Sequence, residues 1–270
     1  MLIGLGVGFG VAQIFFGLAI AAIGIALCFA VTVGISTVLG SFIPLILLQP
    51  KTIFTSKGLT ILGGIILILI GIVVCAMAGK AKEKELSRRP QEGNKRTEMG
   101  YRAGLSLAVL AGVGSPLVNF GLAFGQPFLL RAAQRGVGQA SQANVIWPPL
   151  LTATLVPYLL YCAHLWRKNR SFGLYTLSGT GHYWVLGGLM GALWMGSLVI
   201  YGAASIRMAA IGPILGWPLF MSVIIISSSG WGFVAGEWRG ATRNALRTMS
   251  LGILFLVLGF CTSAYSSTLA

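Results

Sequence analysis

Charged side chains are scarce in this sequence. They make up 9% of its 270 residues, whereas soluble domains carry about 25%. So few charges cannot cover a water-facing surface, and the apolar stretches reach the length of about 20 residues that crosses a bilayer. These stretches are continuously apolar, without the alternation of polar and apolar residues that marks a barrel strand. The composition therefore predicts an all-α integral membrane protein.

Acidic residues are the rarest of the charged ones. The five glutamates are Glu83, Glu85, Glu92, Glu98 and Glu237. The first four share one polar segment, and Glu237 follows the end of an apolar stretch. Ionisable groups in mid-membrane are the usual members of proton relays. Because no carboxylate falls there, the sequence shows no obvious proton relay within its apolar stretches.

The sequence also lacks the spacings that catalytic and metal sites need. Its four cysteines all fall within apolar stretches, without metal-ligand spacing, which favours their being small buried hydrophobic residues. There is no glycine-rich phosphate loop after a strand and no nucleophilic triad. We expect no catalytic residue, no metal and no cofactor. An integral membrane enzyme, a competing interpretation, would need a catalytic cluster near one membrane face.

The net charge is nevertheless strongly positive, at +14 at pH 7. The basic residues gather in loops between apolar stretches, as membrane topology requires, and no basic face is interleaved with aromatic residues. We therefore expect a lipid bilayer as partner and no nucleic acid.

Eight apolar stretches are long enough to span a membrane. They are residues 2–19, 23–48, 58–78, 101–124, 143–165, 182–203, 208–229 and 248–266. The segment GKAKEKELSRRPQEGNKRTEMG (79–100) predicts a flexible linker. With this linker in the cytoplasm, fourteen of the nineteen Lys and Arg residues fall on the cytoplasmic side and five on the other. This bias satisfies the positive-inside rule, so both termini are predicted to lie outside the cytoplasm.

Spans 1–3 resemble spans 6–8. FFGLAIAAIG (15–24) and VIYGAASIRMAAIG (199–212) each place an aromatic–glycine pair before a very short turn of small residues. In the predicted orientation the two copies run in opposite senses. Inverted repeats of this type are typical of secondary transporters, with a substrate site near the midplane; a chance likeness between glycine-rich spans is the alternative. Spans 4 and 5 have no counterparts, so two amino-terminal spans are expected to be missing.

Longer stretches carry a family resemblance. They are GLMGALWMGSLVIYGAASIRMAAIG (188–212), GFVAGEWRGA (232–241), FFGLAIAAIGIALCFAVTVGISTVLGSFIPLIL (15–47), GGIILILIGIVVCAMAGKAKEKE (63–85) and GVGSPLVNFGLAFG (112–125). Together they resemble the L-rhamnose–proton symporter family of the drug/metabolite transporter superfamily.

The resemblance implies a ten-helix fold of two inverted five-helix repeats that imports a sugar together with a cation. On this basis residues 1–78 form an incomplete first repeat of three helices, 79–100 a basic cytoplasmic linker and 101–270 the second repeat of five helices. The expected location is the cell inner membrane. The expected partners are a small sugar, most simply L-rhamnose, and protons.

Candidate substrate-binding residues are amides and aromatic residues within or beside the spans. Amides offer both donors and acceptors to sugar hydroxyls, and aromatic rings stack on sugar C–H faces. The candidates are Gln13, Asn119, Asn144, Trp147, Trp194, Tyr201 and Trp217. Trp194 and Tyr201 are predicted to share one helical face. The alternatives are interhelical hydrogen bonds for the amides and lipid contacts for the aromatic residues.

Three residues are candidates for proton coupling: His164, His182 and Glu237. Histidine is the side chain that changes charge near neutral pH. Both histidines are predicted near the cytoplasmic face, and Glu237 lies beside Arg239, where a local ion pair is the simpler interpretation. A transporter of another small polar metabolite, and a transport-incompetent fragment or partner subunit, are the alternative functions.

Overall fold

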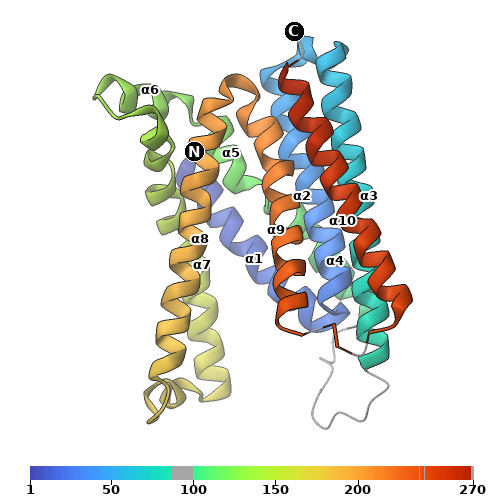
Figure 1. The fold of residues 1–270 in the computed structure, drawn as a ribbon. Coiled ribbons are helices and arrows are strands. Elements are labelled where there is room, and N and C mark those ends of the chain that lie inside the picture. Colours follow the sequence, from blue (N-terminus) through green and yellow to red (C-terminus); the bar gives the residue numbers. More distant parts are fainter. Residues whose placement is uncertain (87–99, 237, 240, 269–270) are drawn as a thin grey trace.

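The computed structural model describes residues 1–86, 100–236, 238–239 and 241–268; at residues 83, 85, 86 and 267 it describes the backbone alone. The described chain is all-helical, and eight of its helical segments are long and apolar enough to cross a membrane. Both the predicted fold class and the predicted number of spans are confirmed. The long helices stand side by side, with both termini at one end of the bundle, the termini end (Figure 1).

The elements follow one another in simple order. Before the linker come α1 (Leu2–Ile23), α2 (Ile25–Leu48), η1 (Pro50–Thr52) and α3 (Ser56–Leu86). After it come α4 (Tyr101–Gly114), α5 (Leu117–Ala123), α6 (Gln126–Gln134), η2 (Gln139–Val145), α7 (Trp147–Asn169) and η3 (Phe172–Thr176). The last are α8 (Gly181–Arg207), η4 (Ala209–Ile211), α9 (Gly212–Val234), α10 (Arg243–Tyr265) and η5 (Ser266–Thr268).

Two spans differ from their predicted form. Span 4, predicted as one helix over 101–124, is broken into α4 and α5 at Ser115 and Pro116. Ser115 keeps helical dihedral angles, but Pro116 has no N–H to donate to the Gly112 carbonyl oxygen, so the helical hydrogen bonding is interrupted there. α3 continues to Leu86, past its predicted end at residue 78. Ala, Lys, Glu and Leu, which dominate residues 80–86, are strong helix formers and prolong the helix.

α3 and α10 share the most extensive contact between two described helices, and glycine permits it. A Cβ atom added to Gly64 would lie 2.2 Å from Ser263 Oγ, and one added to Gly252 would lie 2.5 Å from Cys75 Sγ. Small residues let helix backbones approach closely where lipid supplies no hydrophobic driving force. α2 also packs against α9. These are the helices that the predicted repeat matches to each other, and copies related by a two-fold axis meet in this way.

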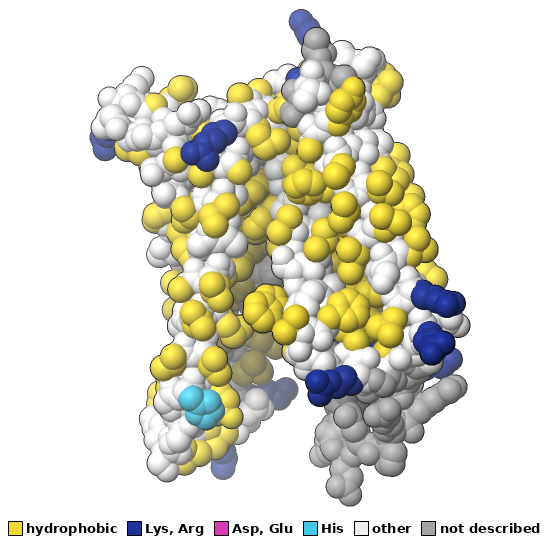
Figure 2. All heavy atoms as spheres, viewed as in Figure 1, with side chains coloured by type: hydrophobic (Ala, Val, Ile, Leu, Met, Phe, Trp, Pro, Cys, Tyr) yellow, Lys and Arg dark blue, Asp and Glu magenta, His cyan; other side chains and the backbone are white. Residues whose placement is uncertain are grey.

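α1 is covered by neighbours along its length. It packs against α4 and α7, and the Thr154 hydroxyl of α7 donates a hydrogen bond to the Gly6 carbonyl oxygen at 2.9 Å. α8, which the repeat matches to α1, is packed differently: residues 181–194 are all exposed, and contact with η2 and α9 begins nearer the helix end. Figure 2 shows the molecule hollowed between α8 and α9, away from the termini end.

Candidate functional site

Asn119 lies where four helices meet. Its side chain, on α5, is fully buried. Nδ2 donates hydrogen bonds to the carbonyl oxygens of Gly40 on α2, at 2.8 Å, and of Pro213 on α9, at 3.1 Å. Oδ1 accepts a hydrogen bond from the Tyr201 hydroxyl on α8. A single amide therefore joins α2, α8 and α9 to α5.

The Gly40 carbonyl is available to Asn119 because of Pro44. Proline has no N–H, so Pro44 cannot make the intrahelical hydrogen bond that the carbonyl four residues earlier would normally accept. Leaving a backbone carbonyl without a hydrogen-bond donor inside a membrane costs on the order of several kcal/mol of free energy. The Asn119 amide satisfies this carbonyl from the neighbouring helix.

Two aromatic residues complete what we call the Asn119 network, which consists of Ser36, Gly40, Asn119, Tyr201, Pro213 and Trp217. The rings of Tyr201 and Trp217 meet edge to face, with their centroids 5.9 Å apart. Trp217 Nε1 donates a hydrogen bond to the Ser36 carbonyl oxygen at 3.0 Å. Glycine at position 40 makes room for the indole, since a Cβ there would lie 2.2 Å from Trp217 Cδ1. Both aromatic side chains are buried.

The network lies in the half of the bundle nearer the termini. Tyr201 precedes the last residue of α8, Arg207, by six residues. At a rise of 1.5 Å per residue this places Tyr201 about 9 Å from the helix end. Since half of a bilayer core is about 15 Å thick, Tyr201 lies between the termini end and the midplane, so the network fills the termini side of the bundle.

Three other candidates lie in contacts outside this network. Gln13 is half-buried on α1 and donates a hydrogen bond through Nε2 to Ser115 Oγ at 3.3 Å. Trp147, at the start of α7, is fully buried and packs against Gly202. Asn144 lies in η2. Neither Trp147 Nε1 nor Asn144 Oδ1 has a hydrogen-bond partner within the described part of the chain.

The remaining candidates lie apart from the network. Trp194 is 45% exposed on the unpacked part of α8, although it shares a helical face with the buried Tyr201. His164, near the end of α7, and His182, at the start of α8, are both exposed. Glu237 lies outside the described residues. Over the residues that the structure describes, no group of His, Cys, Asp and Glu side chains could hold a metal ion.

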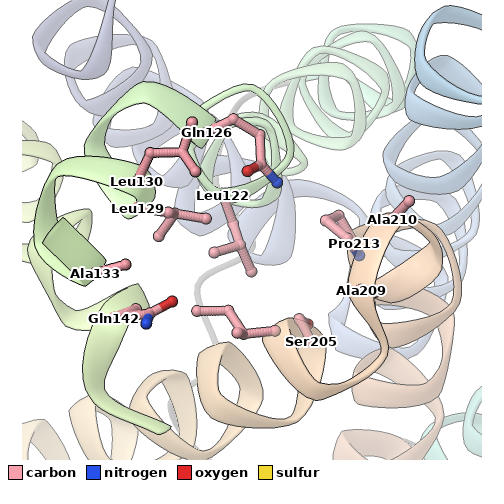
Figure 3. Close-up of a pocket in the computed structure, with 11 residues that line it drawn as sticks. Leu122, Gln126, Leu129, Leu130, Ala133, Gln142, Ser205, Ala209, Ala210 and Pro213 are labelled. Carbon is pink, nitrogen blue, oxygen red and sulfur yellow. The ribbon is translucent and has the colours of Figure 1, made fainter. Parts of the chain in front are cut away.

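The acceptors of the network were not predictable from side-chain patterns. Ser36, Gly40 and Pro213 contribute carbonyl oxygens, which no side-chain pattern reveals. Only the Gly40 carbonyl had a signal in the sequence, because Pro44 leaves the carbonyl four residues before it without an intrahelical donor. A cavity of about 300 Å³, which no sequence pattern indicates, lies beside the network and is lined in part by Gln126 and Gln142 (Figure 3). These glutamines lie between the predicted spans 101–124 and 143–165.

Eight apolar helices around a buried hydrogen-bonding network define a multi-pass membrane protein with a polar interior site. The model of one protein family, described as L-rhamnose-proton symport protein (RhaT), matches residues 1–264. The chain belongs to this family, which is one of transporters rather than enzymes.

Curated relatives agree with the family assignment. The L-rhamnose-proton symporters of Shigella dysenteriae serotype 1 (strain Sd197) and Escherichia coli (strain K12 / DH10B) are each 25% identical to the chain over 261 residues. Each alignment covers 94% of this chain and 74% of the relative. No solved structure matches the chain.

Proposed function

We propose that the chain is a secondary transporter that imports L-rhamnose with a proton across the cell inner membrane, with both termini outside the cytoplasm. The observation that carries the proposal is the convergence of both predicted repeats on Asn119. Ser36 and Gly40 come from the first repeat, and Tyr201, Pro213 and Trp217 come from the second. Secondary transporters with inverted repeats place their substrate site where the repeats meet.

The chemistry of the network suits a sugar. Asn119 presents both a donor and an acceptor, and Tyr201 and Trp217 add aromatic faces with a polar edge. In the closed network the amide bonds to Gly40, Pro213 and Tyr201. Sugar hydroxyls would replace these partners when the network opens. Gln13, Asn144, Trp147 and Trp194 remain candidates for contacts along the path.

The two ends of the bundle support alternating access. The Asn119 network closes the termini end. Away from it, a second cavity of about 420 Å³ lies between the start of α2 and the end of α9, reaching Ile25 and Gly232. In the proposed orientation this end faces the cytoplasm, so the conformation is inward-facing. Rocking of the repeats would then break the network and close the opposite end.

Labelled L-rhamnose uptake into proteoliposomes, with and without a pH gradient, tests the proposal. We expect the gradient to drive uptake, and unlabelled L-rhamnose to compete better than other sugars or polar metabolites. Absence of uptake of any compound in the panel by folded protein would contradict the proposal. If only an unrelated metabolite competes for uptake, that metabolite and not L-rhamnose is the substrate.

His164, His182 and Glu237 are the proposed proton-coupling residues, and each can be tested by substitution with glutamine. Loss of the coupling group should abolish uptake driven by the pH gradient. Exchange of internal for external sugar should persist, because exchange needs no net proton movement. If all three variants keep gradient-driven uptake, none of these residues carries the proton.

A second candidate function, that of a subunit in a larger membrane assembly, is favoured by α8. Residues 181–194 are exposed on every face, and a Cβ added to Gly187, Gly188 or Gly191 would have nothing within 4 Å. Such a helix surface can accept another helix at close range. Cross-linking in membranes from a cysteine at position 191 would capture the partner; no cross-link to any protein would contradict this candidate.

A further inference from the structure

The cavity beside the Asn119 network has a defined construction. It is formed by α6 and η2 on one side and by the turn from α8 through η4 into α9 on the other. Gln126, Leu129, Leu130 and Ala133 line it from α6, at the spacing that puts them on one helical face. Its volume of about 300 Å³ reaches the lower end of the range for small-molecule sites.

The lining combines apolar surface with two amides. Leu122, Leu129 and Ile206 supply apolar surface, and the side chains of Gln126 and Gln142 reach in from α6 and η2 (Figure 3). Gln142 is held in place, because its Nε2 donates a hydrogen bond to the Val137 carbonyl oxygen at 3.2 Å. This arrangement leaves its Oε1 directed into the cavity.

The lining also lacks charge. None of the described residues that line this cavity is acidic or basic. The lining therefore offers an anion or a cation no compensating charge. A neutral ligand with several hydroxyl groups and an apolar edge fits the two amides and the leucine surface. A deoxy sugar, which carries a methyl group in place of a hydroxymethyl group, has this chemistry.

The cavity adjoins the network directly. Ser205 lines the cavity one helical turn beyond Tyr201 on α8, and Leu122 lies one turn beyond Asn119 on α5. Pro213 lines the cavity and also accepts the hydrogen bond from Asn119. A ligand in the cavity is therefore separated from Asn119 by a single layer of residues, which parts only when the network opens.

We propose that this cavity is a separate loading site for a neutral deoxy sugar, in which Gln126 and Gln142 hold the sugar before the Asn119 network opens. The proposal rests on the proposed function. It adds a site at the termini end that is occupied while the network is closed. Sugar then passes from the cavity to Asn119 without returning to bulk water.

Protection of an introduced cysteine tests the loading site directly. Ala133→Cys places a thiol on the cavity face of α6, and Arg135→Cys places a matched thiol nearby that does not line the cavity. The native cysteines are first replaced by serine or alanine. In the purified protein, L-rhamnose should slow maleimide labelling at position 133 at least severalfold and leave position 135 unchanged. Equal rates with and without sugar at position 133 would overturn the loading site.

Uptake kinetics separate this proposal from the proposed function. Gln126→Ala/Gln142→Ala removes two hydrogen-bonding groups and should raise the KM for L-rhamnose about tenfold or more, with little change in maximal rate. Gln134→Ala, on α6 but outside the cavity lining, is the control. Ala133→Trp, which fills the cavity, should raise KM without removing an amide.

The outcomes are distinct. If the parent protein transports L-rhamnose and all cavity variants keep its KM, the loading site is wrong and the proposed function stands. If the parent protein neither transports nor binds any sugar, the proposed function fails and the loading site fails with it. Size-exclusion profiles and thermal unfolding of each variant establish that it is folded.

Discussion

The hydroxyl of Tyr201 donates a hydrogen bond to Oδ1 of Asn119, which joins α8 to α5 across 82 residues of sequence. Both side chains are buried, and the two remaining Asn119 contacts are to backbone carbonyls of α2 and α9. The pair therefore helps to hold α2, α5, α8 and α9 together at the termini end. We expect this hydrogen bond to break when a path opens from that end to the centre of the bundle.

Removal of the Tyr201 hydroxyl should destabilise the protein. Tyr201→Phe leaves Asn119 Oδ1 buried without its donor, and an unsatisfied buried group costs about 1–3 kcal/mol. We expect a lower midpoint of thermal unfolding in detergent. Tyr183→Phe, at an exposed position on the same helix, is the matched control and should not change the midpoint. Equal midpoints for both variants would show that the hydrogen bond contributes nothing to stability.

A methyl group at position 40 should displace the Trp217 indole. The added Cβ of Gly40→Ala would lie 2.2 Å from Trp217 Cδ1, too close for any packed arrangement. Overpacking of this kind costs about 1–3 kcal/mol. Thermal unfolding should reveal the loss. Gly34→Ala, on the same helix, meets only Leu69 Cδ2 at 4.0 Å and should unfold like the parent protein.

Adjacent glycines on α3 should respond differently to the same substitution. Gly64→Ala forces a Cβ to within 2.2 Å of Ser263 Oγ, whereas a Cβ at Gly63 has nothing within 4 Å. We expect Gly64→Ala to lower the yield of monodisperse protein and the unfolding temperature. Gly63→Ala should leave both unchanged. The reverse order of stability would contradict the close contact between α3 and α10.

Two tryptophans proposed for sugar contact should differ in uptake. Trp217→Phe removes the donor to the Ser36 carbonyl and disturbs the network, so the rate of L-rhamnose uptake should fall at least tenfold. Trp194→Phe keeps an aromatic ring at an exposed position of α8 and should change the rate less than twofold. A larger loss of uptake rate for Trp194→Phe than for Trp217→Phe would indicate that the substrate path runs along the unpacked part of α8 instead.

Membrane orientation can be measured in intact cells. Lys51 and Arg170 are both exposed, in η1 and after α7. With the native cysteines replaced, Lys51→Cys should react with an impermeant maleimide from outside. Arg170→Cys should react only after the membrane is permeabilised. The opposite pattern would place both termini in the cytoplasm.

The spans were predictable because long apolar runs and loop charges depend on local sequence alone. Asn119, Tyr201 and Trp217 were also predictable as candidates, since polar groups within spans are few. The contacts among these three residues were not predictable from the sequence. They depend on how α5, α8 and α9 pack and on backbone carbonyl partners, which leave no side-chain pattern. Pro116 carried enough information to predict the break between α4 and α5.

Trp194 illustrates the limit of helical periodicity. Its spacing from Tyr201 correctly puts the two residues on one face of α8. Periodicity does not say how far along the helix a neighbour extends, and the packing on α8 begins beyond residue 194. The cavity residues Gln126 and Gln142 were missed for a related reason: short helices between spans carry no apolar run.

The glycine-lined contact between α3 and α10 also determines how motion in this protein can be measured. A shift of either helix along the other would push a side chain into the facing backbone, so we expect the pair to resist sliding and to act as the pivot about which the repeats rock. Spectroscopic labels placed on these two helices should keep a constant separation. Distances from this pair to α8 would then report the opening of either end against a reference frame that does not move.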